Sequence, residues 1–343
     1  MKVLVASVLI LVGSCSSLRH SEKIDHLKDS ISYDNKGVVK KYLKTITPEE
    51  LKIVVEEVAS EKYNGRMTGE KGHNEICNFI RNYYDSLGIK PPASHPNYFQ
   101  NVPKEALPDD LNESQNVIAY IEGSEFPNEY IYITAHSDHE GIINGEIYPG
   151  ADDNGSGTAA VFEMAEAFKK AVMDGNGPKR SIVFLHVTAE EVGLYGSRYY
   201  TNNPIFPLEN TVSTLNMDMI GRVDERHKND ENYIYVIGAD RISTQLHFII
   251  QEANYNFTNL NLDYKYNDDN DHNRYYYRSD HYNFATKGIP VVFFFNGEHE
   301  DYTKPTDTAD KINYPLLAKR TKLIFATAWY LANSPERLKA EII

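Results

Sequence analysis

Cysteine is nearly absent from this sequence, which holds only Cys15 and Cys77 among its 343 residues. Two cysteines form at most one disulfide, so a small scaffold held together by several disulfides is excluded. A zinc site built on cysteine is also excluded, because such sites use several thiolates. Any metal ion bound by this chain must therefore be held by histidine and carboxylate side chains.

Positive charge is scarce as well. The chain has 35 Lys and Arg residues against 49 Asp and Glu residues, and its net charge is -14. Nucleic-acid-binding proteins usually present a basic face, so the charge balance argues against a nucleic-acid partner. The composition, with 41% hydrophobic and 24% charged residues, is ordinary for a globular protein that buries a sizeable core.

A long apolar run occurs only at the N-terminus, where Val3–Val12 follows Lys2 and precedes small residues and Cys15. One basic residue, a short apolar core and small residues are typical of a secretory signal peptide. The run is too short to span a bilayer, which takes about 20 residues. A cysteine after small residues resembles the processing site of bacterial lipoproteins, in which that cysteine carries the lipid.

These features predict the domain organisation and the location of the protein. We expect a lipoprotein-type signal peptide over residues 1–15, a tether over 16–40 and the folded domain over 41–343. The expected location is the cell envelope of a bacterium, in the periplasm or at the outer membrane. A lipid on Cys15 is then the membrane attachment, and an ordinary secretion signal is the alternative.

The rest of the chain alternates between strand and helix patterns. Helical spacing after Gly157 and over residues 51–87 and 314–332 predicts helices, and residues 91–115 read as a long loop. Several of the predicted strands are continuously apolar, as for strands covered on both faces. The predicted strands are Asn116–Ile121, Tyr130–Ala135, Ser181–Thr188, Val212–Met217, Tyr233–Ile237 and Ile289–Phe295. This alternation predicts a three-layer α/β/α sandwich with a mixed, mostly parallel central sheet.

Acidic and histidine residues follow the predicted strands where each strand ends. His136 closes the second run, Glu190 and Glu191 follow the third, and Asp218 follows the fourth. Asp153 precedes the helix that starts near Gly157. Ligands of open α/β sheets bind outside the carboxyl ends of the strands, so we expect these side chains to meet at one edge.

Several carboxylates in one pocket repel one another, and the cost is high unless a cation neutralises them. Histidine with Asp and Glu, without thiolates, suits zinc, with manganese and cobalt as alternatives. Taken singly, each of these motifs is more often a turn, a helix cap or a solvated surface. Their occurrence at successive strand ends favours a metal site, and a shared carboxylate would allow a two-metal hydrolytic centre.

The motifs together resemble peptidase family M28, the zinc aminopeptidases and carboxypeptidases. The resemblance runs from about Glu49 to Leu331 and also includes the stretches 65–69, 279–281, 287–290 and 307–310. It implies the zinc exopeptidase fold and a peptide substrate with a free N-terminus. It also implies a cis peptide bond between Asp153 and Asn154.

The resemblance assigns a role to each site residue. His136 and Asp218 would bind one zinc ion, Asp153 would bridge two ions, and Glu191 would bind the second. The catalytic residues it implies are Glu190 as general base, Asp138 as the residue that orients His136, and Tyr302 as an oxyanion donor.

One position departs from the family pattern. The last family ligand is a histidine after a tyrosine, and here Thr303 follows Tyr302. A threonine hydroxyl is a poor zinc ligand beside imidazole, so the second ion is expected to bind weakly. The open outcomes are replacement by a nearby residue such as His299, activity with a single ion, or loss of activity.

Two other functions compete with the peptidase. A glutaminyl-cyclase-like acyltransferase shares the fold and uses one zinc at the positions of Asp153, Glu191 and Thr303, and the missing histidine counts against it. A non-catalytic surface lipoprotein that binds peptides or a partner is the other alternative, and Thr303 is its supporting feature.

Overall fold

The computed structural model describes residues 20–342. The predicted signal peptide and its Cys15 therefore lie outside the described residues. Within residues 20–342, no helix is both long enough and apolar enough to cross a membrane.

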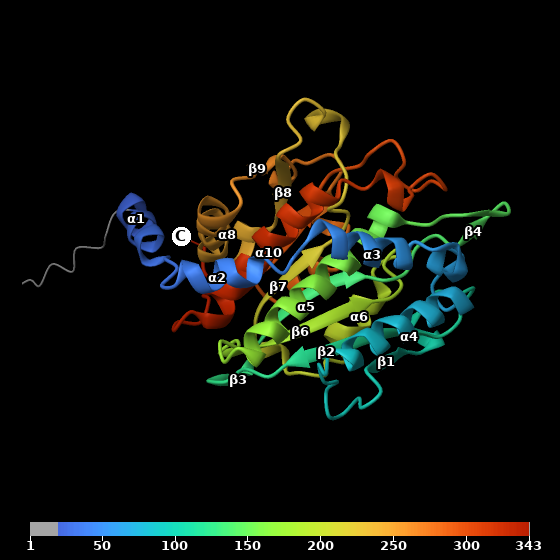
Figure 1. Cartoon of the computed structure of the whole chain (residues 1–343), viewed down its shortest axis with the longest axis horizontal. Helices are drawn as coiled ribbons and strands as arrows, with labels where there is room; N and C mark the ends of the chain where they lie inside the picture. The colour runs from blue at the N-terminus through green and yellow to red at the C-terminus, as the bar shows by residue number, and fades with distance from the viewer. Residues whose placement is uncertain (1–19, 343) are drawn as a thin grey trace, which may run out of the picture.

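An eight-stranded mixed sheet forms the centre of the fold (Figure 1). The β6–β3, β3–β7, β7–β10 and β8–β9 pairs are parallel, and the other three pairs are antiparallel. In spatial order the strands are β1 (Phe99–Val102), β2 (Ser114–Ile121), β6 (Arg180–Val187), β3 (Phe126–His136), β7 (Thr211–Met217), β10 (Val291–Phe295), β8 (Tyr233–Ile237) and β9 (Asn261–Asp263). A short hairpin, β4 (Ile142–Ile143) with β5 (Glu146–Ile147), stands apart from this sheet.

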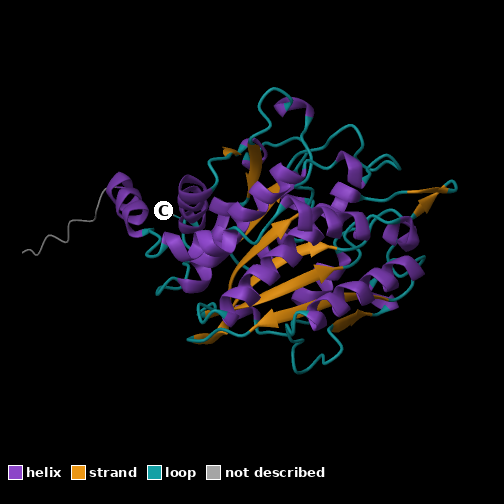
Figure 2. Cartoon of the chain, viewed as in Figure 1, coloured by secondary structure: helices purple, strands orange, loops and turns teal. Residues whose placement is uncertain are grey.

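Helices cover both faces of the sheet and complete the predicted three-layer sandwich (Figure 2). The larger core holds residues of α2 (Lys36–Leu43), α3 (Pro48–Val58), α4 (Lys71–Ser86), α5 (Gly157–Met173), α8 (Thr244–Phe257) and α10 (Tyr314–Asn333). The smaller core, on the opposite face, holds residues of α6 (Tyr195–Asn202) and α9 (His281–Ala285). The remaining helices are α1 (His20–Ser30) and α7 (Ala239–Ile242).

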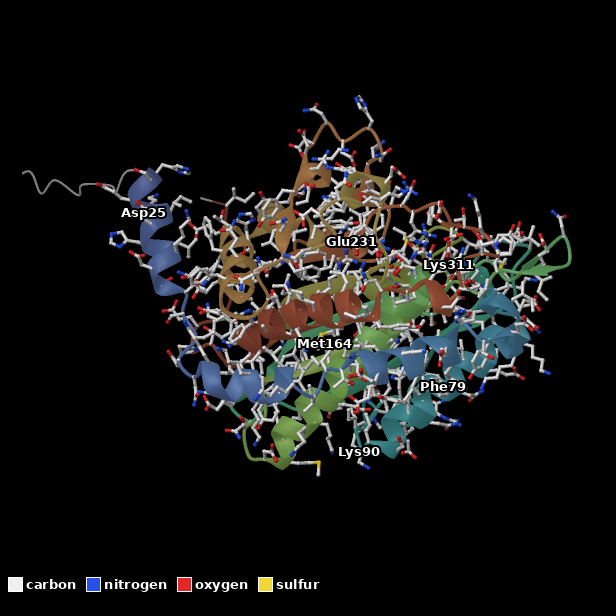
Figure 3. The ribbon with its side chains drawn as sticks, turned by 45° about the horizontal axis from the view of Figure 1, so that its top comes forward. Asp25, Phe79, Lys90, Met164, Glu231 and Lys311 are labelled. Atoms are coloured by element: carbon white, nitrogen blue, oxygen red, sulfur yellow. The ribbon has the colours of Figure 1, made fainter. Side chains whose placement is uncertain are left out.

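Alternation along the strands builds these two cores. On β6, Ile182 and Phe184 belong to the larger core, whereas Val183 and Leu185 belong to the smaller one. Met164 of α5, labelled in Figure 3, is fully buried in the larger core. Strands covered on both faces are mostly apolar, which explains why the sequence pattern predicted the six longest sheet strands.

Helix starts follow ordinary capping chemistry. Thr47 precedes α3, and its hydroxyl accepts a hydrogen bond from the backbone N–H of Glu50 over 3.2 Å, while Pro48 occupies the first helical position. Asn313 caps α10 in the same way through the N–H of Leu316. These caps fix where the two helices begin relative to the sheet.

The tether prediction is wrong for residues 31–40. This stretch includes the start of α2, and Ile31, Tyr33 and Val39 are buried in the larger core. The Tyr33 hydroxyl also donates to the backbone carbonyl of Ala326 on α10 over 2.8 Å. Only α1 fits a peripheral segment, since it buries no residue and its Asp25 lies at the edge of the molecule in Figure 3.

The stretch 91–115 is not wholly a loop. Its residues Phe99–Val102 form β1, which pairs antiparallel with β2 at the edge of the sheet. A four-residue strand that follows the polar segment 91–98 gives too short an apolar pattern to be recognised in the sequence.

Candidate metal centre

Neighbouring parallel strands bring the predicted ligands to one edge of the sheet. His136 is the last residue of β3 and pairs with Val187, the last residue of β6. Asp218 follows directly after β7, the other neighbour of β3. The carboxyl ends of β6, β3 and β7 thus place His136, Asp218 and the Glu190–Glu191 pair at one edge.

The first ligand group consists of His136, Asp153 and Asp218. The Nε2 atom of His136 lies 3.2 Å from Oδ1 of Asp153 and 3.2 Å from Oδ1 of Asp218. Two donor atoms bound to one tetrahedral zinc ion at 2.0–2.1 Å lie ~3.4 Å apart. The spacing of these three side chains therefore fits one zinc ion without a change in the fold.

The second ligand group consists of His139, Asp153 and Glu191. The Nδ1 atom of His139 lies 2.7 Å from Oε1 of Glu191 and 4.0 Å from Oδ2 of Asp153. Asp153 thus offers one oxygen to each group. His139 was missed in the sequence, although its place three residues after His136 could have drawn attention to it.

His299, the nearby replacement for the missing histidine at Thr303, belongs to neither of these groups. Thr303 is half-buried and has a φ of 51°, in the left-handed region. The His299 ring interacts with a different carboxylate, since its Nε2 lies 3.1 Å from Oδ2 of Asp152. The structure therefore does not favour His299 as the replacement ligand.

Asp138 is placed differently from the expectation. His136 contacts the backbone carbonyl of Asp138, with Nδ1 3.2 Å from the oxygen, whereas the nearest carboxylate oxygen of Asp138 is 3.9 Å away. The carboxylate instead accepts hydrogen bonds from the backbone N–H groups of Glu190 and Glu191, over 3.2 and 3.4 Å, and from the Thr68 hydroxyl over 2.8 Å. Asp138 thus orients His136 through its main chain and holds the Glu190–Glu191 loop through its side chain.

Residues distant in sequence fix the turn that carries Asp153. The Asp153–Asn154 peptide bond is cis, as the family resemblance implied. Oδ2 of Asp307 accepts hydrogen bonds from the backbone N–H groups of Asp152 and Asp153 over 2.9 and 3.2 Å. The buried guanidinium of Arg66 donates to the carbonyls of Gly150 and Asp153 over 3.0 and 3.4 Å. Arg66 and Asp307 belong to the stretches of family resemblance, and the structure shows what they do.

Burial opposes ionisation of three acidic residues of the centre, Asp153, Glu190 and Glu191. It raises the pKa of Asp153 to about 6, with help from the charge of Glu191, and raises the pKa of Glu191 to about 8. Burial also raises the pKa of Glu190 well above its usual value. For His136, burial acts to lower the pKa, but the carboxylates of Asp218 and Glu190 outweigh it and the pKa is raised. These carboxylates ionise together only when a cation compensates them.

The donor set fits zinc. The two groups supply imidazole nitrogen and carboxylate oxygen, which zinc accepts in a four-coordinate site, and both leave room for a water or substrate atom. Asp153 is common to both groups, so a pair of ions bridged by one carboxylate is compatible with this arrangement.

A cavity of about 420 Å³ opens onto the centre. Asp153, Glu190, Glu191 and Asp218 form its polar end. The aromatic residues that line it are Tyr275, Tyr277, Phe293, Phe295 and Tyr302. A cavity with a charged end and an aromatic wall can take a ligand that combines a polar group with an apolar side chain.

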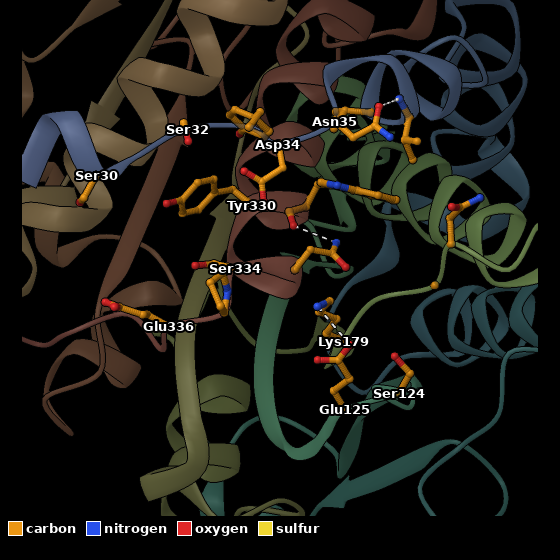
Figure 4. Close-up of a pocket in the computed structure, with 18 of the residues that line it drawn as sticks. Ser30, Ser32, Asp34, Asn35, Ser124, Glu125, Lys179, Tyr330, Ser334 and Glu336 are labelled. Carbon is orange, nitrogen blue, oxygen red and sulfur yellow. Dashed lines mark hydrogen bonds and ion pairs between the residues drawn. The ribbon is translucent and has the colours of Figure 1, made fainter.

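Another cavity, of about 590 Å³, lies where the residues after α1 meet the end of α10 (Figure 4). Its lining includes Asp34, Glu125, Lys179 and Glu336, but no histidine or cysteine. Lys179 pairs with Glu125 over 3.0 Å. This cavity contains none of the strand-end residues and no catalytic set.

Comparisons with known proteins agree with this geometry. The family model described as "Peptidase family M28" matches residues 116–328, which is more than half of the chain. A probable zinc metalloprotease of Pyricularia oryzae is 27% identical over 305 residues, which cover 77% of this chain and 58% of that protein. Aminopeptidase YwaD of Bacillus subtilis is 26% identical over 234 residues, which cover 66% of this chain and 46% of that protein. The chain thus spans about half the length of the curated relatives it matches.

Solved structures share the fold. LapB from Legionella pneumophila superposes with a TM-score of 0.70 at 21% identity, covering 93% of this chain and 83% of that one. The glutaminyl cyclase of Porphyromonas gingivalis superposes with a TM-score of 0.64 at 15% identity, covering 82% and 97%. At these identities the likeness establishes the fold alone. The chemistry has to be argued from the residues of the site.

Proposed function

The chain belongs to peptidase family M28, and on this premise we propose that it is a zinc-dependent aminopeptidase that acts on peptides with a free N-terminus. The observation that carries the proposal is a pair of histidine and carboxylate groups that share Asp153 at the end of a cavity. The Bacillus subtilis relative carries the name aminopeptidase, which supports the same activity.

Zinc, when bound, would polarise the scissile carbonyl and make a nearby water more acidic. Glu190 lines the cavity beside Asp153 and Asp218, and the hydrogen bond from its backbone N–H to Asp138 fixes its position. In the proposed mechanism the Glu190 carboxylate accepts a proton from the attacking water and delivers it to the leaving amine.

The cavity also suggests how the substrate is held. The aromatic wall favours an apolar first side chain. The Tyr302 hydroxyl, which accepts a hydrogen bond from Nη2 of Arg278 over 3.3 Å, is the proposed donor to the developing oxyanion.

The test is a comparison of Glu190→Gln with the parent protein after loading with zinc. We expect release of N-terminal residues from aminoacyl anilides and short peptides to fall by a factor of ~10²–10⁴, the range for loss of a general base, while the zinc content is unchanged. Glu56→Gln, at an exposed position on α3, is the matched control. Full activity of Glu190→Gln would show that another group is the base, and an inactive, zinc-loaded parent protein would refute the peptidase.

Two alternatives are separated in the same experiment. The glutaminyl cyclase likeness makes peptides with N-terminal glutamine the appropriate second substrate, and ammonia release without peptide-bond cleavage would favour the acyltransferase. The buried ligand group of His136 argues against the acyltransferase. That function uses a single zinc ion at the positions of Asp153, Glu191 and Thr303, and so gives His136 no metal to bind. Binding of peptides without any turnover would favour the non-catalytic lipoprotein.

A further inference from the structure

The second ligand group lacks the histidine of the family pattern at Thr303, but it contains another histidine. We propose that His139 supplies the imidazole ligand that Thr303 cannot provide and completes a second zinc site with Asp153 and Glu191. The inference rests on the metal centre of the proposed function and concerns a residue to which the family resemblance gives no role.

Distance is the first argument. The Nδ1 atom of His139 lies 2.7 Å from Glu191 and 4.0 Å from Asp153, on either side of the ~3.4 Å expected between two ligands of one tetrahedral zinc ion. Changes of about 0.7 and 0.6 Å in these two distances would bring both to the separation expected for zinc ligands. Asp153 already directs its other oxygen to His136, so it can bridge the two sites.

The second argument is that the His139 ring has no other polar role. The side chain is fully buried, and within residues 20–342 its ring nitrogens contact only the two carboxylates, since Nε2 has no hydrogen-bond partner. The Nδ1 atom of His139 faces the carboxylates of both Glu191 and Asp153, as a nitrogen ligand to a metal ion between them would.

The fold also makes room for this ring and fixes it. A β-carbon at Gly150 would lie 2.5 Å from Cδ2 of His139, so the ring occupies the space that a side chain at that position would take. The backbone N–H of His139 donates to the carbonyl of Arg66 over 3.2 Å. Arg66 in turn donates to Gly150 and to the carbonyl of Asp153, and so ties the His139 loop to the Asp153 turn.

Two other histidines are already engaged, and His281, whose ring nitrogens lack a hydrogen-bond partner, belongs to none of the groups able to hold a metal among residues 20–342. His299 contacts Asp152, and His73 contacts the hydroxyls of Ser137 and Ser114, over 3.1 and 3.2 Å. Among residues 20–342, the groups able to hold a metal contain no histidine other than His136 and His139. His139 is therefore the imidazole available to Asp153 and Glu191.

Zinc content is the direct test, because it does not depend on turnover. The purified protein, stripped with chelator, is titrated with zinc chloride, and bound zinc is measured calorimetrically and by elemental analysis. We expect two ions for the parent protein and one for His139→Ala and for His139→Gln. His299→Gln tests the rival histidine, and His247→Gln on α8 is a matched control; both are expected to keep two ions.

A rescue separates ligand loss from a general structural defect. Installing the family histidine in the deficient variant, as His139→Ala with Thr303→His, is expected to restore the second ion. Cobalt(II) substitution adds a spectroscopic readout, since loss of a nitrogen ligand changes the visible d–d bands, whereas loss of a mere hydrogen bond leaves the ligand set intact. Melting curves of the metal-free variants show whether each one folds.

The outcomes distinguish this inference from the proposed function. A parent protein that binds no zinc would refute both. Two ions in a folded His139→Ala variant, or a single ion both in the parent protein and in that variant, would overturn the role of His139 and leave the peptidase proposal standing. Loss of one ion in His139→Ala and His139→Gln, with cobalt bands altered and the rescue effective, would establish it.

Discussion

The hydroxyl of Ser279 donates a hydrogen bond to Oδ2 of Asp218 over 2.7 Å, and the other oxygen of Asp218 lies 3.2 Å from Nε2 of His136. Ser279 accepts in turn from the side-chain amide of Asn216, whose carbonyl accepts from Thr134. This buried chain of hydrogen bonds fixes the direction in which Asp218 presents its free oxygen. The outer partners of metal ligands tune affinity in this way.

Ser279→Ala should therefore weaken zinc binding at the first site. The expected loss is ~10-fold in affinity, because Asp218 becomes free to rotate and the Asn216 amide loses its acceptor. Competition with a chromophoric chelator measures the affinity. Ser86→Ala on α4, where an exposed hydroxyl donates to a backbone carbonyl, is the matched control. An unchanged affinity in Ser279→Ala would mean that packing alone orients Asp218.

Tyr302→Phe should lower turnover more than it changes substrate binding. Burial and the nearby charges of Asp153 and Glu191 raise the pKa of Tyr302, so its hydroxyl stays protonated and able to donate. Loss of one oxyanion donor typically reduces kcat by a factor of ~10²–10³, with a small effect on KM. Tyr255→Phe, at an exposed position on α8, is the control. A change in KM alone would assign Tyr302 to substrate binding.

Glu163 on α5 gives a prediction that does not involve the metal. Burial, followed by repulsion from Glu50, raises its pKa from 4.5 to about 8. Between these values the folded protein keeps the proton that the unfolded chain releases, so this residue lowers stability as the pH rises through that window.

Glu163→Gln, which cannot ionise, should remove this pH dependence. We expect the variant to be more stable than the parent protein by ~3–5 kcal/mol near pH 9, and by no more than ~1 kcal/mol near pH 5. Denaturant unfolding of the metal-free proteins at the two pH values measures the difference, with Glu56→Gln as the exposed control. Equal stability near pH 9 would show that Glu163 is not held in its neutral form.

For the location of the protein, we propose export and a lipid anchor on Cys15. Cys15→Ser should move the full-length protein from the membrane fraction to the soluble fraction of the envelope and abolish incorporation of labelled fatty acid. Cys77→Ser, at the buried free cysteine on α4, is the matched control and should keep the label. A parent protein that carries no label and is already in the soluble fraction of the envelope would favour an ordinary secretion signal.

Much of the fold and the first ligand group could be predicted from the sequence, because each depends on local patterns. Strands β2, β3, β6, β7, β8 and β10 are largely buried on both faces, so apolar residues dominate their buried parts and most of these runs are easily recognised. His136 and Asp218 stand at or directly after strand ends, and the parallel order of the central strands carries such positions to one edge.

What the sequence determined by itself is therefore the layered sheet, its family and the edge at which acidic and histidine side chains gather. Only the tertiary structure decided that His139 faces Glu191, that Ser279 orients Asp218 and that residues 31–39 pack onto α10 instead of forming a tether. These contacts join residues that are far apart in the sequence, so no local sequence pattern predicts them. They depend on the path of the loops and on the space beside small residues such as Gly150. Both are set only when the chain folds.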